Sequence, residues 1–161
     1  MRNQSGKTPE DRIGYLALDG VDAEILFPNK GLPIWATPDA AFSLAMCRSY
    51  NEWAWETFSD FNDVLAPMAC VAPASIEGTI AEIERCAKLG FKGVSFPCKP
   101  VWGAPDHTQL NYNLPEFDDL WACVQAVELP ITFHVSTGRD PRTSRGNGGA
   151  IINYAVHSLA P

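Results

Sequence analysis

His134 is the residue of this sequence whose position most clearly points to chemistry. It lies near the end of the β-prone run Ile131–Val135 and is followed by small polar residues and a glycine. Active sites of parallel barrel folds lie at the carboxyl ends of the strands, and a histidine there can transfer protons or bind a metal. One histidine does not complete a zinc site, which normally takes three or more protein ligands. The alternative is a structural histidine that bonds a backbone carbonyl.

Three arginines, Arg139, Arg142 and Arg145, follow this run in a single loop. Their guanidinium groups could clamp the carboxylate of a small molecule through paired hydrogen bonds. Arg142 and Arg145 are the better candidates because nearby glycines allow a ligand to approach closely. The equal alternative is that the arginines pair with the surplus acidic side chains at the surface.

Further candidate residues follow the other β-prone runs. Asn29 comes directly after the first run and is a candidate for lining a pocket. Trp35 and Trp102 fall on strand-end loops, where their rings could wall a ring-shaped substrate or simply pack. The two remaining histidines, His107 and His157, are expected in a solvated loop and on a helix face.

The composition indicates one soluble globular domain, residues 1–161. The chain has 161 residues, a formal net charge of −7 and 46% apolar residues. An acidic chain lacks the basic stripe that binds nucleic acid, and no apolar run nears the roughly 20 residues of a membrane span. No secretory signal is expected at the N-terminus. Five cysteines without a C-x-x-C pair indicate reduced thiols, so we expect a cytoplasmic protein.

Short apolar runs alternate with amphipathic segments along the chain. The runs are rich in β-prone residues and are punctuated by Pro or Gly, which is typical of parallel strands buried on both faces. The predicted strands are Ala23–Phe27, Leu65–Ala72, Lys92–Phe96 and Ile131–Val135. The predicted helices are Pro9–Leu18, Pro38–Phe58, Ser75–Leu89, one from near Pro115, and one from near Gly149 to His157.

Two of these helices carry clear local signals. Ser75 is a predicted N-cap and Gly90 a predicted stop for the helix between them. The helix before it carries large apolar residues at helical spacing, which predict a stripe in the core. These residues are Phe42, Met46, Tyr50 and Trp53.

Strict alternation of strand and helix predicts right-handed crossovers and a parallel sheet. Two architectures fit four such units: a small doubly wound sheet, or an arc of a (β/α)₈ barrel. A doubly wound nucleotide-binding sheet usually has a glycine-rich turn after its first strand, but Pro28–Gly31 is not such a turn. Polar residues gather after the strands instead, where barrel enzymes place their chemistry. We therefore predict a partial (β/α)₈ TIM barrel.

Five segments, in order, resemble the amidohydrolase-related family of metal-dependent hydrolases and decarboxylases, which includes aminocarboxymuconate-semialdehyde decarboxylase. Each segment alone is a modest signal, and their common order makes the resemblance stronger. The segments are Asp19–Pro28 (DGVDAEILFP), Ala45–Trp53 (AMCRSYNEW), Gly90–Val94 (GFKGV), Phe117–Trp121 (FDDLW) and Pro130–Val135 (PITFHV). The resemblance covers nearly the whole chain.

The resemblance implies a (β/α)₈ barrel that binds one divalent metal, with Zn²⁺ the metal expected. In the family, an H-x-H pair on the first strand, a histidine ending the fifth and an aspartate ending the eighth hold this metal. By the resemblance, His134 is the fifth-strand ligand. The sequence has no H-x-H pair, and its segments correspond to strands two to five. Four strands do not close an eight-stranded barrel.

These observations leave two functional hypotheses. The first is a fragment of a hydrolase or a carbon–carbon lyase (decarboxylase) that takes a carboxylated small molecule, with a homo-oligomer expected for the intact enzyme. His134 binds its metal, and Asn29, Trp102, Arg142 and Arg145 bind its substrate. The isolated chain is then expected to be inactive, with the metal absent or weakly bound. The alternative is a stand-alone half-barrel, a binding or scaffold module that oligomerises without catalysis.

Overall fold

The computed structural model describes residues 7–29, 32–35, 37, 39–98, 112–134, 148, 149 and 151. Its strands all pair in parallel, in one sheet of order β1-β2 and another of order β3-β4-β5. The strands are β1 (Glu24–Leu26), β2 (Leu65–Pro67), β3 (Ala69–Cys70), β4 (Val94–Pro97) and β5 (Ile131–His134). The four predicted strands are therefore confirmed, with shorter bounds, and the second is divided into β2 and β3.

A single residue, Met68, separates β2 from β3 and joins the two sheets. The Met68 N–H donates to the Leu26 carbonyl of β1, and the next residue, Ala69, donates to the Gly93 carbonyl just before β4. The extended segment thus bonds to β1 up to Met68 and to the β4 side from Ala69 onward. The strands follow one another in chain order as four β/α units, although the sheet is interrupted at this point.

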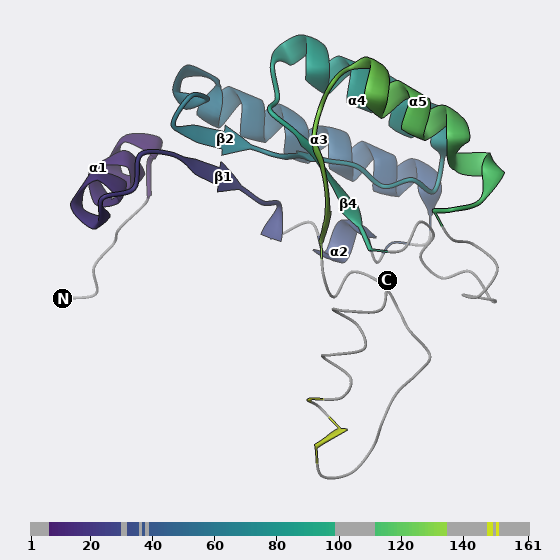
Figure 1. The fold of residues 1–161 in the computed structure, drawn as a ribbon, viewed down its shortest axis with the longest axis horizontal. Coiled ribbons are helices and arrows are strands. Elements are labelled where there is room, and N and C mark those ends of the chain that lie inside the picture. The colour runs from purple at the N-terminus through teal and green to yellow at the C-terminus, as the bar shows by residue number, and fades with distance from the viewer. Residues whose placement is uncertain are drawn as a thin grey trace.

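The helices that connect the strands gather on one side of them, as Figure 1 shows for α3, α4 and α5. Helix α1, by contrast, lies beside β1 and apart from the other helices. The helices are α1 (Pro9–Asp19), α2 (Leu32–Trp35), α3 (Ala40–Phe58), α4 (Ile76–Leu89) and α5 (Asp118–Ala126). Short 3₁₀ turns, η2 (Ser59–Phe61) and η3 (Pro115–Phe117), follow α3 and precede α5.

Local capping explains where α4 begins and ends. The Ser75 side chain accepts a hydrogen bond from the Gly78 N–H, and Gly90 ends the helix with φ 109° in the left-handed region. Glycine alone adopts this conformation without strain. Both signals were predicted from the sequence and are confirmed. The predicted helix from Gly149 to His157 lies largely outside the described residues.

The main hydrophobic core lies between β3–β5 and helices α4 and α5. Phe96 of β4 is fully buried and contacts the rings of Trp121 and Phe133. The other buried members are Val71, Ile83, Val94, Phe117, Leu120 and Val124. None of the described helices is long and apolar enough to cross a membrane.

The predicted core stripe of α3 is wrong for its outer members. Phe42 is 58% exposed and Trp53 is 53% exposed, whereas Met46 and Tyr50 are half-buried. The buried face of α3 instead carries Ser43, Cys47, Asn51 and Ala54. These smaller side chains let the helix approach the strands closely, and Asn51 forms hydrogen bonds that an apolar residue could not. Phe42 and Trp53 consequently face outward.

Candidate functional site

His134 ends β5, at the carboxyl edge of the parallel sheet, as the sequence predicts. It pairs in register with Pro97, the last residue of β4. Burial alternates along β5: Ile131 and Phe133 are exposed, whereas Thr132 and His134 are half-buried. The imidazole therefore shares a face of the strand with the Thr132 side chain.

The ring of Trp35 packs against His134. The two ring centroids are 5.6 Å apart and the planes are tilted by 48°. Trp35 is only 2% exposed, and its indole N–H donates a 2.8 Å hydrogen bond to the Val71 carbonyl, just beyond β3. Of the two roles that the sequence left open for Trp35, the structure shows packing against the strand ends.

Helix α2, which carries Trp35, was missed by sequence reasoning. It has four residues, too few for an amphipathic period to be seen. Its position is set from α3, where the Ser43 hydroxyl donates a 3.1 Å hydrogen bond to the Ile34 carbonyl. Ile34 and Trp35 then join a buried cluster with Cys47, Cys70 and Ala72. Tertiary contacts, rather than local signals, hold this short helix.

Asn29 lies in a different part of the molecule. It is exposed and lines a groove of about 770 Å³ between α1, β1 and α3. Tyr50 and Trp53 form the α3 side of this groove, and Arg12 of α1 forms an ion pair with Glu24 across it. The hydrogen bonds that Arg12 donates to the Glu24 carboxylate raise the pKa of Arg12 above its ordinary value. His134 is not among the described residues that line this groove.

The remaining predicted site residues cannot be placed beside His134. Trp102, Arg142 and Arg145 lie outside the described residues, so their roles stay predictions. Within the described part of the chain, no group of three or more His, Cys, Asp or Glu side chains could hold a metal. The described residues alone therefore do not fit a metal site, and His134 supplies at most one ligand.

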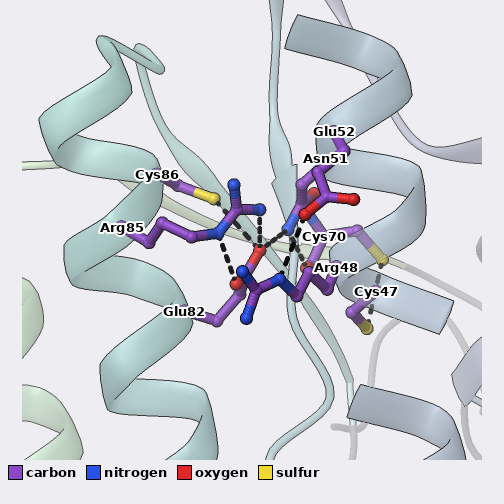
Figure 2. A network of polar contacts seen from close by, with 8 residues as sticks. All are labelled: Cys47, Arg48, Asn51, Glu52, Cys70, Glu82, Arg85 and Cys86. Atoms are coloured by element: carbon purple, nitrogen blue, oxygen red, sulfur yellow. Dashed lines mark hydrogen bonds and ion pairs between the residues drawn. The ribbon is translucent and has the colours of Figure 1, made fainter. Parts of the chain in front are cut away.

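A buried polar network joins α3, α4 and β3, as Figure 2 shows. The Asn51 amide accepts a 2.7 Å hydrogen bond from the Cys70 N–H and donates a 3.0 Å bond to the Cys70 carbonyl. The N–H and carbonyl of Cys70 lie on the edge of β3 opposite β4, where no described strand pairs with them. The Asn51 amide takes the place of a neighbouring strand there. Asn51 also donates a 2.8 Å bond to Glu82 of α4.

Glu82 is only 5% exposed and is held as a carboxylate by its neighbours. Arg85 donates two hydrogen bonds to it, of 2.6 and 2.8 Å. Burial acts to raise the pKa of Glu82, but the bonds from Arg85 and Asn51 outweigh it, so the pKa lies below its ordinary value. Sequence reasoning missed this network because its members are scattered over two helices and one strand.

Burial also governs the three cysteines around this network. Cys47 and Cys70 place their sulfur atoms 3.9 Å apart, and Cys86 contacts Glu82. Burial raises the pKa of Cys70 well above its ordinary value, and the contact with Cys47 adds to the effect. All three are buried, as predicted for reduced thiols that pack in the interior.

Comparison with known proteins decides the family. A family model described as amidohydrolase matches residues 4–157. The chain belongs to the amidohydrolase family. No curated protein matches the sequence.

Solved structures of this amidohydrolase fold are similar over most of the chain. A 2,6-dihydroxybenzoate decarboxylase bound to 2,6-dihydroxybenzoate is 19% identical, with a TM-score of 0.72, and the match covers 98% of this chain and 48% of that one. A 5-carboxyvanillate decarboxylase from Sphingomonas paucimobilis is 22% identical, with a TM-score of 0.65, covering 92% and 41%. A dihydroxybenzoic acid decarboxylase from a Polaromonas species, with bound manganese and the inhibitor 2-nitroresorcinol, is 22% identical, with a TM-score of 0.68, covering 93% and 43%.

These similarities establish the fold. The predicted partial TIM barrel is confirmed, because four parallel β/α units superpose on barrel enzymes of the same family. The chain spans less than half the length of these solved structures, at 48%, 41% and 43%. That residues 1–161 form a single domain stays a prediction.

Proposed function

We propose that this chain is part of a metal-dependent amidohydrolase-family decarboxylase that acts on a carboxylated, ring-shaped small molecule. The observation that carries the proposal is the place of His134, half-buried at the carboxyl end of a parallel strand in this family's fold. Decarboxylation is preferred to hydrolysis because the similar structures include decarboxylases of hydroxylated benzoates.

We assign the site residues by chemistry. His134 is one metal ligand, and the arginines Arg142 and Arg145 hold the substrate carboxylate, since guanidinium groups match carboxylates in charge and geometry. Asn29 and Trp102 are assigned to the substrate pocket. The metal is proposed to be zinc or manganese, because a similar decarboxylase has manganese bound. Such a metal supplies a Lewis acid to the substrate.

We propose that the remaining metal ligands and the barrel closure come from other polypeptide, since four strands do not close an eight-stranded barrel. The 161-residue chain is therefore proposed to be inactive by itself. The whole enzyme is proposed to be a cytoplasmic homo-oligomer whose partners are small carboxylates, and neither nucleic acid nor membranes.

The test is CO₂ release from 2,6-dihydroxybenzoate and a panel of hydroxybenzoates. The native polypeptide that carries this sequence is loaded with Mn²⁺ or Zn²⁺, and its intact mass is measured alongside. Release that is lost in His134→Ala but kept in the matched histidine variants His107→Ala and His157→Ala supports the proposal. Absence of release from every carboxylate would contradict it.

One observation favours the alternative of a half-barrel module that assembles with other copies. At the edges of the described sheets, apolar side chains are exposed. They are Ile25 of β1, Phe27 just after it, and Ile131 and Phe133 of β5. Unpaired apolar strands invite further strand pairing. A native mass equal to 17.6 kDa, with a stable metal-free oligomer in solution, would favour this function over the enzyme.

A further inference from the structure

Trp35 links the carboxyl ends of two strands, β3 and β5. It lies on α2, which follows β1 in the chain. Its indole N–H donates to the Val71 carbonyl just after β3, and its ring packs on His134 at the end of β5. At 2% exposure the indole is fixed in place on nearly every side.

The Trp35 ring is one support for the imidazole of His134. A histidine ring rotates easily about its last side-chain bond, and β5 lies at the edge of the described sheet. The side chains that precede it on the other face of the strand are exposed, at 38% for Ile131 and 45% for Phe133. A centroid separation of 5.6 Å lies in the range where aromatic pairs attract each other.

We propose that Trp35 is a positioning residue for His134. The hydrogen bond to Val71 fixes the indole, and the indole sets the orientation of the imidazole. The ends of β3 and β5 are thereby held in place relative to each other. The proposal deepens the proposed function, since the orientation of His134 matters most if it binds the metal. The contact between the Trp35 and His134 rings can be tested without an assay of enzyme activity.

A second tryptophan supplies the matched control. Trp121 also donates its indole N–H to a backbone carbonyl, that of Tyr112 at 3.0 Å, and also packs among aromatic rings. Its described ring contacts do not include His134. Losing Trp121 therefore removes a comparable bond and aromatic packing, while leaving the Trp35 ring in contact with His134.

The first experiment is NMR of the histidine ring signals in the isotope-labelled full chain. Wild type is expected to show cross-relaxation between the Trp35 indole and the His134 imidazole. Trp35→Leu should shift and broaden the His134 signals. Trp35→Phe keeps a ring but loses the N–H bond to Val71, so it should restore them only in part, and Trp121→Leu should leave them unchanged. The proposal is overturned if wild type lacks the cross-relaxation, or if folded Trp35→Leu leaves the His134 signals in place. If Trp35→Leu does not fold, the cross-relaxation in wild type and the His134 signals in Trp35→Phe still test the proposal.

A second readout separates this proposal from the proposed function. In the native polypeptide, loss of a residue that orients a metal ligand typically lowers metal affinity by about 10–100-fold. We expect the affinity for Mn²⁺ to fall by that factor in Trp35→Leu. It should recover in part in Trp35→Phe and stay at the wild-type value in Trp121→Leu. Shifted His134 signals in a native polypeptide that binds no Mn²⁺ and releases no CO₂ would refute the function and keep the positioning role. Mn²⁺ affinity equal to wild type in Trp35→Leu would refute the metal-orienting part of the role.

Discussion

Two halves of this molecule follow the same alternation of strand and helix but reach different degrees of burial. In the half made of β3–β5, α4 and α5, large side chains such as Phe96 and Leu120 are fully buried. In the half made of α1, β1 and the outer face of α3, Phe42 and Trp53 are more than half exposed, and α1 buries no residue. An amphipathic helix is buried only when a neighbouring unit packs on it. Further protein is therefore expected on this half, as it is on the face of β5 that exposes Ile131 and Phe133.

The largest expected difference is in core stability. Phe96→Ala should lower the free energy of unfolding by about 3–5 kcal/mol, because it leaves a cavity among buried aromatic rings. Phe42→Ala, the same substitution at an exposed position, should change it by no more than about 0.5 kcal/mol. Urea unfolding measures both. Equal losses would show that the α3 stripe is buried after all.

A smaller loss is expected at the junction of the two halves. Asn51→Ala removes the partners of both backbone groups of Cys70 and a donor to Glu82. We expect a loss of about 2–3 kcal/mol in the free energy of unfolding, since buried polar groups are left unpaired. Arg48→Ala is the control on the same helix; it breaks only an exposed ion pair with Glu52 and should cost about 0–1 kcal/mol. A similar cost for both variants would argue against the strand-edge role of Asn51.

The Glu82 carboxylate should make stability depend on pH. Its pKa is lowered in the folded chain, so its contribution is present above the ordinary value of 4.5 and is lost as pH falls through the folded value. Glu82→Gln should therefore be less stable than wild type at pH 7, and the difference should shrink in acid. Urea unfolding at pH 7 and at several values below 4.5 measures this. A difference that stays constant with pH would mean that the charge of Glu82 contributes nothing.

The smallest effect on stability is expected in the exposed half. Trp53→Ser should change the free energy of unfolding by no more than about 0.5 kcal/mol, because the side chain is 53% exposed. It should nevertheless reduce self-association of the chain, since it removes apolar surface from the groove beside α1. Sedimentation at several protein concentrations measures this. Unchanged association would show that copies do not meet through this groove.

Several features could be predicted because their causes are local. Ser75 and Gly90 bound α4 through hydrogen bonds to its own backbone, so their signals are visible in the sequence. The strand that ends at His134 is likewise visible as a short β-prone run with polar residues after it. The order of such units was enough to predict parallel strands, and the polar residues after them favoured an arc of a barrel, as found.

The sequence by itself thus determined the elements, their parallel order, the place of His134 and the resemblance to the amidohydrolase family. Only the tertiary structure decided which face of α3 is buried and what Trp35 contacts. Asn51 bonds Cys70 and Glu82, which lie 19 and 31 residues away, and Trp35 bonds Val71, 36 residues away. Both faces of α3 have helical spacing, so periodicity does not choose between them. The choice depends on side chains brought close only by folding.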